Sequence, residues 1–159
     1  MSESLSPVKR KLPEVRMACF CDQVIQGADN AISIIRIIDR VTVEVARPPT
    51  PADTTNESIP YPVTLFAMLD GVRPWGGNSV EFWARSPRGS FEQKAEIQLG
   101  SDDRASDTAN FILPTAIDLR RPGRIEVELR LAGKRLARRQ LELVVTVPDG
   151  SVPATSHDE

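Results

Sequence analysis

The strongest constraint on the fold lies in the C-terminal third of the chain, where apolar and charged residues alternate. Residues 124–131 read Arg-Ile-Glu-Val-Glu-Leu-Arg-Leu, so the apolar residues share one face and Glu126, Glu128 and Arg130 share the other. A glycine-containing turn leads to a second apolar run at 141–147. A period of two indicates half-buried strands, and two such runs joined by a short turn indicate an antiparallel hairpin.

The rest of the chain has the same character. Its 13 prolines fall mostly between apolar runs, and no stretch keeps apolar residues at helical spacing over three turns. With 159 residues the chain is long enough for one domain with its own core. The sequence therefore predicts an all-β fold, an immunoglobulin-like antiparallel β-sandwich of seven or eight strands. The sandwich is expected over 14–147, with disordered polar tails at 1–13 and 148–159.

Two segments leave alternatives open. The run 31–45 is apolar on both sides, which is typical of a central strand covered on both faces or of a strand that crosses between sheets. In the hairpin, Leu136 and Leu141 are five apart, so strict alternation cannot bury both. Either the loop has an odd length or a bulge absorbs one residue near 137–140. Without such an irregularity, Arg138 or Arg139 would face the core.

Several segments together resemble a known group of proteins. Cys21-Asp22 lies within the first strand, Ile-Ile-Arg-Ile-Ile-Asp-Arg-Val fills 34–41, Ser-Pro-Arg-Gly makes a turn, and Arg-Pro-Gly-Arg-Ile opens the hairpin. This combination is similar to an uncharacterised family of short bacterial β-sandwich proteins, over about residues 15–147. The resemblance implies a bacterial β-sandwich and brings no catalytic residues.

The titratable residues argue against catalysis and metal binding. The single histidine, His157, lies in the expected C-terminal tail, where no catalytic arrangement can be held rigidly. Cys19 and Cys21 lie on the same face of a predicted strand, and we expect two small buried apolar residues there, without a disulfide. Zinc takes about four ligands, more than this set offers. We predict no catalytic residue, no cofactor and no metal.

The charge distribution suggests a binding surface. Eight basic residues lie between positions 120 and 139, against only two acidic ones, in a chain whose net charge is −2. One interpretation is a hairpin with cross-strand Glu–Arg pairs, and the other is a basic face for an acidic partner. The candidate partner-binding residues are Arg120, Arg121, Arg124, Arg135, Arg138 and Arg139. Nucleic acid is disfavoured, since no aromatic stripe accompanies the arginines.

A further candidate is Trp75, which follows Arg73-Pro74 and precedes a pair of glycines. Exposed, this side chain would contact a partner; folded back, it would cap the end of the sandwich.

These observations favour a non-catalytic binding module, or a small subunit of a bacterial assembly, whose partner is another protein or a second copy. The alternative is a carbohydrate-binding protein or a carboxylate-based hydrolase with a cleft on the sandwich. No run approaches the ~18 apolar residues of a membrane span, and no secretory signal pattern is recognised, so we expect a cytoplasmic protein without membrane contact.

Overall fold

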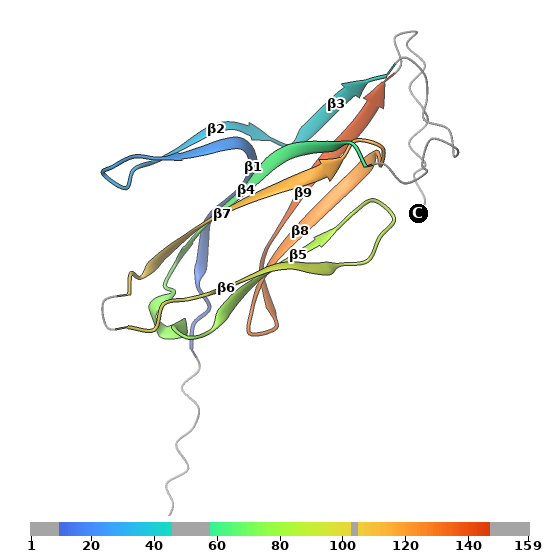
Figure 1. Cartoon of the computed structure of the whole chain (residues 1–159). Coiled ribbons are helices and arrows are strands. Elements are labelled where there is room, and N and C mark those ends of the chain that lie inside the picture. The colour runs from blue at the N-terminus through green and yellow to red at the C-terminus, as the bar shows by residue number, and fades with distance from the viewer. Residues whose placement is uncertain (1–9, 46–57, 103–104, 147–159) are drawn as a thin grey trace, which may run out of the picture.

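The chain forms two packed β-sheets, visible as two layers of arrows in Figure 1. The computed structural model describes residues 10–45, 58–102 and 105–146. Sheet A has the order β2-β1-β4-β7, with β1 Glu14–Gln26, β2 Ile32–Ile38, β4 Pro60–Asp70 and β7 Thr108–Asp118. Sheet B has the order β3-β9-β8-β5-β6, with β3 Arg40–Glu44, β5 Ser79–Arg85, β6 Glu92–Gln98, β8 Gly123–Leu131 and β9 Lys134–Thr146. The described residues also include one short 3-10 helix, η2, at Arg73–Trp75.

The predicted all-β sandwich is confirmed, with nine strands in the described residues where seven or eight were expected. The extra strand comes from the run 31–45, which the structure divides into β2 and β3 at Asp39. β2 pairs with β1 in sheet A, and β3 pairs in parallel with β9 in sheet B. The alternative of a strand that crosses between sheets is therefore correct. The central-strand alternative is wrong, because β2 and β3 are both edge strands.

The crossing makes the two lateral sides of the sandwich unlike. On one side the chain itself joins the sheets, and the backbone carbonyl of Asp39 accepts a hydrogen bond from the Glu142 N–H at 2.9 Å. Here β1 also lies close to β9. On the opposite side the sheets end in β7 and β6.

The core fills the space between the sheets with the alternating apolar residues of nearly every strand. Among the alternating apolar residues of the hairpin, Val127, Leu129, Leu143 and Val145 are buried and Ile125 is partly exposed. The other large members of this core are Phe20, Leu65, Leu69, Trp75, Phe82, Phe111, Leu131 and Leu141. A second, smaller cluster of Cys19, Cys21 and Phe66 lies on the outer face of sheet A. Both cysteines are free and buried, as expected.

The N-terminal boundary differs from the prediction. Residues 10–13 were assigned to a disordered tail, but Pro13 is buried and Leu12 packs against the core. The Lys11 carbonyl accepts a hydrogen bond from the indole N–H of Trp75 at 3.0 Å. A few apolar contacts therefore order a segment whose composition is polar. The predictions for residues 1–9 and 148–159 lie outside the described residues.

The same contact corrects the assignment of Trp75 to a partner surface. Trp75 is 9% exposed and belongs to the main core, and its one polar atom is satisfied by Lys11. The alternative of a tryptophan folded back against the sandwich is correct, because its large ring is more stable out of water.

Candidate functional site

The arginines predicted to form one basic surface are distributed over different parts of the molecule. Arg135 and Arg138 lie on the outer face of sheet B, whereas Arg139 donates from its Nε to the Ala18 carbonyl of sheet A at 2.6 Å. A bulge lies between Arg135 and Arg138, because Leu129 pairs with Ala137 and Arg130 with Arg135, which leaves Leu136 of β9 unpaired. Arg139 directly follows Arg138 and therefore faces the opposite side of the sheet. The bulge lies one residue before the predicted range.

Of the remaining candidates, Arg124 lies on that outer face, whereas Arg120 and Arg121 follow the C-terminal end of β7. Arg121 forms an ion pair with Asp118 at 3.6 Å, and the Arg120 backbone N–H donates to the same carboxylate at 3.0 Å. Arg124 is exposed on β8, opposite Glu142 in the strand register. The predicted set is therefore brought together only in part.

On the outer face of sheet B the arginines surround two buried carboxylates. Glu126 accepts hydrogen bonds from Arg85, Arg138 and Gln140. Glu128 forms ion pairs with Arg130 at 2.7 Å and with Arg135 at 3.2 Å. The two glutamates are 2% and 5% exposed. The interpretation as cross-strand Glu–Arg pairs is correct, although the glutamates are buried and not solvated.

Two aromatic rings cover these ion pairs. The Arg130 guanidinium lies 4.6 Å from the ring centre of Trp83 and 5.7 Å from that of Phe91. Arg85 and Arg138 lie 5.0 and 5.9 Å from the Phe91 ring centre. Burial acts to raise the pKa of both glutamates, but the hydrogen bonds and charges of the arginines outweigh it and lower the pKa. Each glutamate is shared by two arginines, so the group keeps an excess of two positive charges, and all four guanidinium groups are held against the sheet by these ion pairs.

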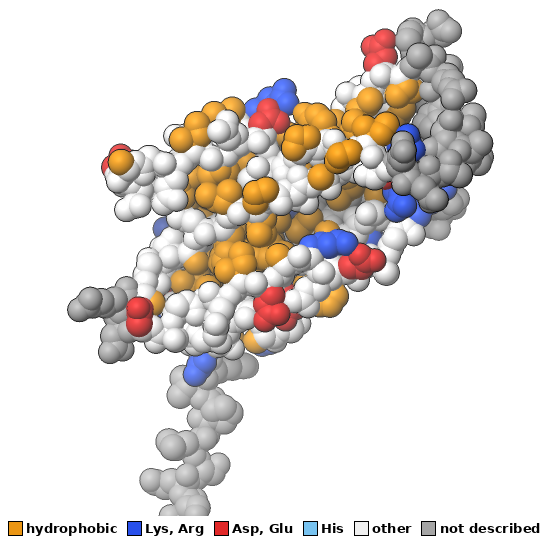
Figure 2. Space-filling model, viewed as in Figure 1, with side chains coloured by type: hydrophobic (Ala, Val, Ile, Leu, Met, Phe, Trp, Pro, Cys, Tyr) orange, Lys and Arg blue, Asp and Glu red, His pale blue; other side chains and the backbone are white. Residues whose placement is uncertain are grey.

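A cleft between the sheets provides the stronger candidate site. It has a volume of about 410 Å³ and opens on the side where the sheets end in β7 and β6. Apolar side chains are visible in the hollow between the two layers in Figure 2. The apolar residues lining it include Phe20, Leu65, Phe82, Leu113, Ile125 and Val127. A cleft of this size with a mostly apolar lining is typical of a binding site.

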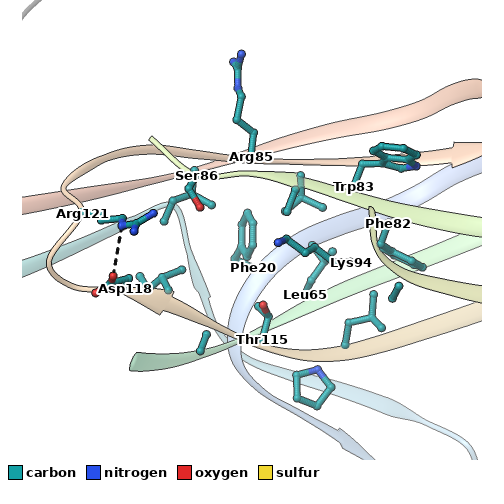
Figure 3. Close-up of a pocket in the computed structure, with 18 of the residues that line it drawn as sticks. Phe20, Leu65, Phe82, Trp83, Arg85, Ser86, Lys94, Thr115, Asp118 and Arg121 are labelled. Atoms are coloured by element: carbon teal, nitrogen blue, oxygen red, sulfur yellow. Dashed lines mark ion pairs between the residues drawn. The ribbon is translucent and has the colours of Figure 1, made fainter. Parts of the chain in front are cut away.

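Only a few polar groups border this cleft. The Arg121–Asp118 ion pair lies at one end, Thr115 borders the opening, and the Arg85 side chain points away from it (Figure 3). Lys94 also lines the cleft and pairs with Glu92 at 2.5 Å. Asp118 is the single carboxylate among the lining residues, so the paired acids of a carboxylate-based hydrolase are not found there. The described part of the chain contains no group of three or more histidine, cysteine, aspartate or glutamate side chains that could hold a metal ion.

The strand that borders the cleft has a free backbone edge. Within the described residues β7 pairs only with β4. The Leu119 N–H donates to the Ile59 carbonyl, so by alternation the odd-numbered residues of β7 direct their backbone groups toward β4. The even-numbered residues direct theirs outward. Asn110, Ile112 and Ala116 thus offer free N–H groups, while Pro114 has none.

The two strands at the mouth of the cleft are unequal as edges. β6 has seven residues, of which Glu92, Lys94 and Glu96 are charged, and a bulge interrupts its pairing with β5. β7 has eleven residues and a single charged one, Asp118, at its end. Charges, short length and bulges protect an edge from pairing with another chain, so β7 is the less protected strand.

Sequence reasoning missed this cleft because its walls come from six different strands. The available signal was Pro114 inside an otherwise apolar strand, since proline in a sheet is largely confined to edges.

Comparisons with known proteins give little guidance. No protein-family model matches the chain, and no curated protein matches it. One solved structure with a resemblance is the alkylpurine DNA glycosylase of Pseudomonas fluorescens bound to DNA containing an abasic site analogue. The two sequences are 16% identical, the TM-score is 0.36, and the match covers 64% of this chain and 27% of that one. At this TM-score the resemblance carries no argument about activity or partner. In the part of the chain that the structure describes, no helix has the length and apolar character needed to cross a membrane.

Proposed function

We propose that this protein is a non-catalytic binding module that accepts an extended segment of a partner protein along β7. The observation that carries the proposal is the free edge of β7 running beside the apolar cleft. The partner is another protein or a second copy of the chain, not nucleic acid or a membrane. Two free cysteines are compatible with the cytoplasm, the location we propose for this function.

Binding of this kind is β-strand addition, in which main-chain hydrogen bonds supply affinity and alternate side chains supply specificity. A partner strand would accept hydrogen bonds from the N–H groups of Asn110, Ile112 and Ala116. Its alternate side chains would enter the cleft against Phe20 and Leu113. Pro114 offers no donor, so the proposed partner meets a gap in the ladder at that position, which restricts the register of pairing.

The edge itself supplies a test. Ala116 is exposed and directs its N–H outward, so Ala116→Pro removes one donor without touching the pairing with β4. Ala116→Ser is the matched control, since it changes the same side chain and keeps the donor. Peptides selected from a random display library on the wild-type protein are the probe. We expect them to alternate apolar and polar residues and to bind Ala116→Pro about tenfold more weakly than Ala116→Ser.

A second variant tests the cleft separately. Thr115 borders the opening, so Thr115→Trp fills the space and leaves the outward donors in place. The selected peptides should lose affinity for this variant as well, measured by fluorescence anisotropy. Equal binding to wild type, Ala116→Pro and Thr115→Trp would place the peptides elsewhere and refute the proposal.

A further inference from the structure

Most of the sulfur-containing side chains of the chain are gathered at one place, on the face of sheet A opposite to the cleft. The sequence has two cysteines and three methionines. Four of these five residues, Met17, Cys19, Cys21 and Met68, belong to the small cluster on the outer face of sheet A. The fifth is Met1, at the start of the chain.

The strand geometry explains how they meet. Met17, Cys19 and Cys21 alternate along β1 and therefore share a face. Met68 of β4 lies directly opposite Met17 in the register. The two cysteines belong to one small buried cluster, and the Cys21 thiol donates weakly to the Thr64 carbonyl at 3.5 Å.

The two thiols share apolar neighbours but differ in the charges near them: Arg139 acts on Cys19, whereas Asp22 acts on Cys21. Cys19 is 9% exposed and Cys21 is fully buried, with Phe66 opposite Cys19. Burial raises the pKa of the Cys19 thiol, while the contact with Cys21 and the charge of Arg139 act in the opposite direction. Arg139 is held at this place by its hydrogen bond to the Ala18 carbonyl.

We propose that Cys19 and Cys21 form a binding site for a soft monovalent metal ion, copper(I), with Met17 and Met68 as flanking thioethers. Thiolate and thioether sulfur are the ligands that select copper(I). Two thiolates suffice for this ion in linear coordination, whereas zinc takes about four ligands. On binding, two S–H bonds break, two S–Cu bonds form, both protons leave to solvent, and no electron is transferred. The resulting bis-thiolate complex carries one negative charge, which the Arg139 guanidinium offsets.

The test uses copper(I) held as its bicinchoninate complex under nitrogen. The full-length wild-type protein should remove one copper ion per chain and develop thiolate-to-copper charge-transfer absorption in the ultraviolet. Cys19→Ala with Cys21→Ala should abolish both signals. Met17→Leu with Met68→Leu should weaken uptake by about tenfold, the lower end of the effect of supporting groups at metal sites. Glu142→Gln, on the outer face of sheet B, is the control that should bind copper normally.

Circular dichroism of each variant establishes that it is folded. X-ray absorption at the copper edge of the wild-type complex needs no variant and should show sulfur ligands alone. Failure of the wild-type protein to compete for copper, uptake by the folded double alanine variant, or nitrogen and oxygen ligands would each overturn the proposal.

Discussion

The outer faces of the two sheets are stabilised in different ways although both sheets contribute to the same core. On sheet B, long arginine side chains lie over Glu126 and Glu128, and aromatic rings cover the arginines. On sheet A, short apolar and sulfur-containing side chains surround Phe66. One face therefore depends on ion pairs and hydrogen bonds, and the other on the removal of apolar surface from water.

This difference has consequences for exposed surface. Sheet B has no large exposed apolar side chain among Ser79–Arg85, Glu92–Gln98 and Gly123–Leu131, because the arginine stems cover its face. Sheet A leaves Ile35, Ile37 and Ile112 between 38% and 58% exposed. The ion pairs of sheet B therefore leave no large apolar side chain of those strands exposed to solvent. On sheet A, large apolar side chains at the edge of the apolar face remain exposed.

Among substitutions on the two outer faces, we expect Phe66→Ala to lower the free energy of unfolding most. Phe66 is fully buried at the centre of the outer cluster of sheet A, so its removal leaves a cavity and costs about 3 kcal/mol of unfolding free energy. Urea denaturation measures the change. Ile112→Ala, at the exposed position opposite Phe66 on β7, is the control and should cost less than about 1 kcal/mol. Equal effects would show that the cluster contributes no stability of its own.

The second effect concerns sheet B. Glu126→Gln removes the charge that Arg85 and Arg138 share, and we expect a loss of about 2 kcal/mol, the range for hydrogen bonds to charged groups. The arginines can turn to solvent, which keeps the loss below that of a fully buried pair.

The control is Glu142→Gln on the same face. Glu142 pairs with Arg40 at 2.7 Å, but both side chains are exposed, so the loss should stay within about 1 kcal/mol. Thermal unfolding of the two variants compares them directly. If both lose the same amount, burial of Glu126 has no energetic consequence.

Local features of this architecture could be predicted from the sequence, and long-range ones could not. Alternation is a property of neighbouring residues, and it located the hairpin correctly. The parallel pairing of Val41 with Leu143 joins segments about a hundred positions apart, and nothing local encodes it. The cleft depends on the same long-range arrangement.

The division of the predicted basic surface has a related cause. Counting charges between 120 and 139 ignored which face each arginine would occupy: the bulge at Leu136 places Arg135 and Arg138 on one face, and ordinary alternation places Arg139 on the other. The count also took two glutamates as minor, although they are the centres around which the arginines are arranged. Charge along a sequence predicts a surface only when strand register is known.

At acidic pH we expect a smaller loss of stability, and we expect it to come from the outer face of sheet B and not from that of sheet A. The net pKa of Glu126 and Glu128 is lowered in the folded protein, so their contribution to stability is present above the unfolded value of about 4.3 and is lost as pH falls through the folded pKa. Urea denaturation from pH 7 to pH 3 should show a steeper loss for wild type than for Glu126→Gln with Glu128→Gln.

Asp70 provides the comparison on sheet A. A hydrogen bond from Arg16 lowers its pKa too, but this pair is largely exposed, with side chains 61% and 29% accessible. Asp70→Asn should therefore leave the acid slope close to that of wild type. If Asp70→Asn changed the loss of stability in acid and the double glutamine variant did not, the assignment of acid sensitivity to sheet B would be wrong.

The smallest effect should appear in alkali, and it should come from sheet A. Burial raises the pKa of the thiols of Cys19 and Cys21, so the folded protein keeps these protons at a pH where the unfolded chain, with a thiol pKa of about 8.5, has begun to lose them. The folded state then binds more protons than the unfolded state, and stability falls as pH rises from that value through the folded pKa. Denaturation of the metal-free protein between pH 7 and pH 10 should show this decline.

The variant Cys19→Ala with Cys21→Ala should be less stable at pH 7, because packed atoms are removed. Its stability should then decline less steeply toward pH 10 than that of wild type, because the titrating groups are gone. The double glutamine variant of sheet B should keep the wild-type alkaline slope, since its carboxylates were already ionised. If the stability of the alanine variant falls as steeply with pH as that of wild type, groups other than these two thiols cause the loss in alkali. The outer faces of the two sheets would then not account for the loss of stability at high and at low pH respectively.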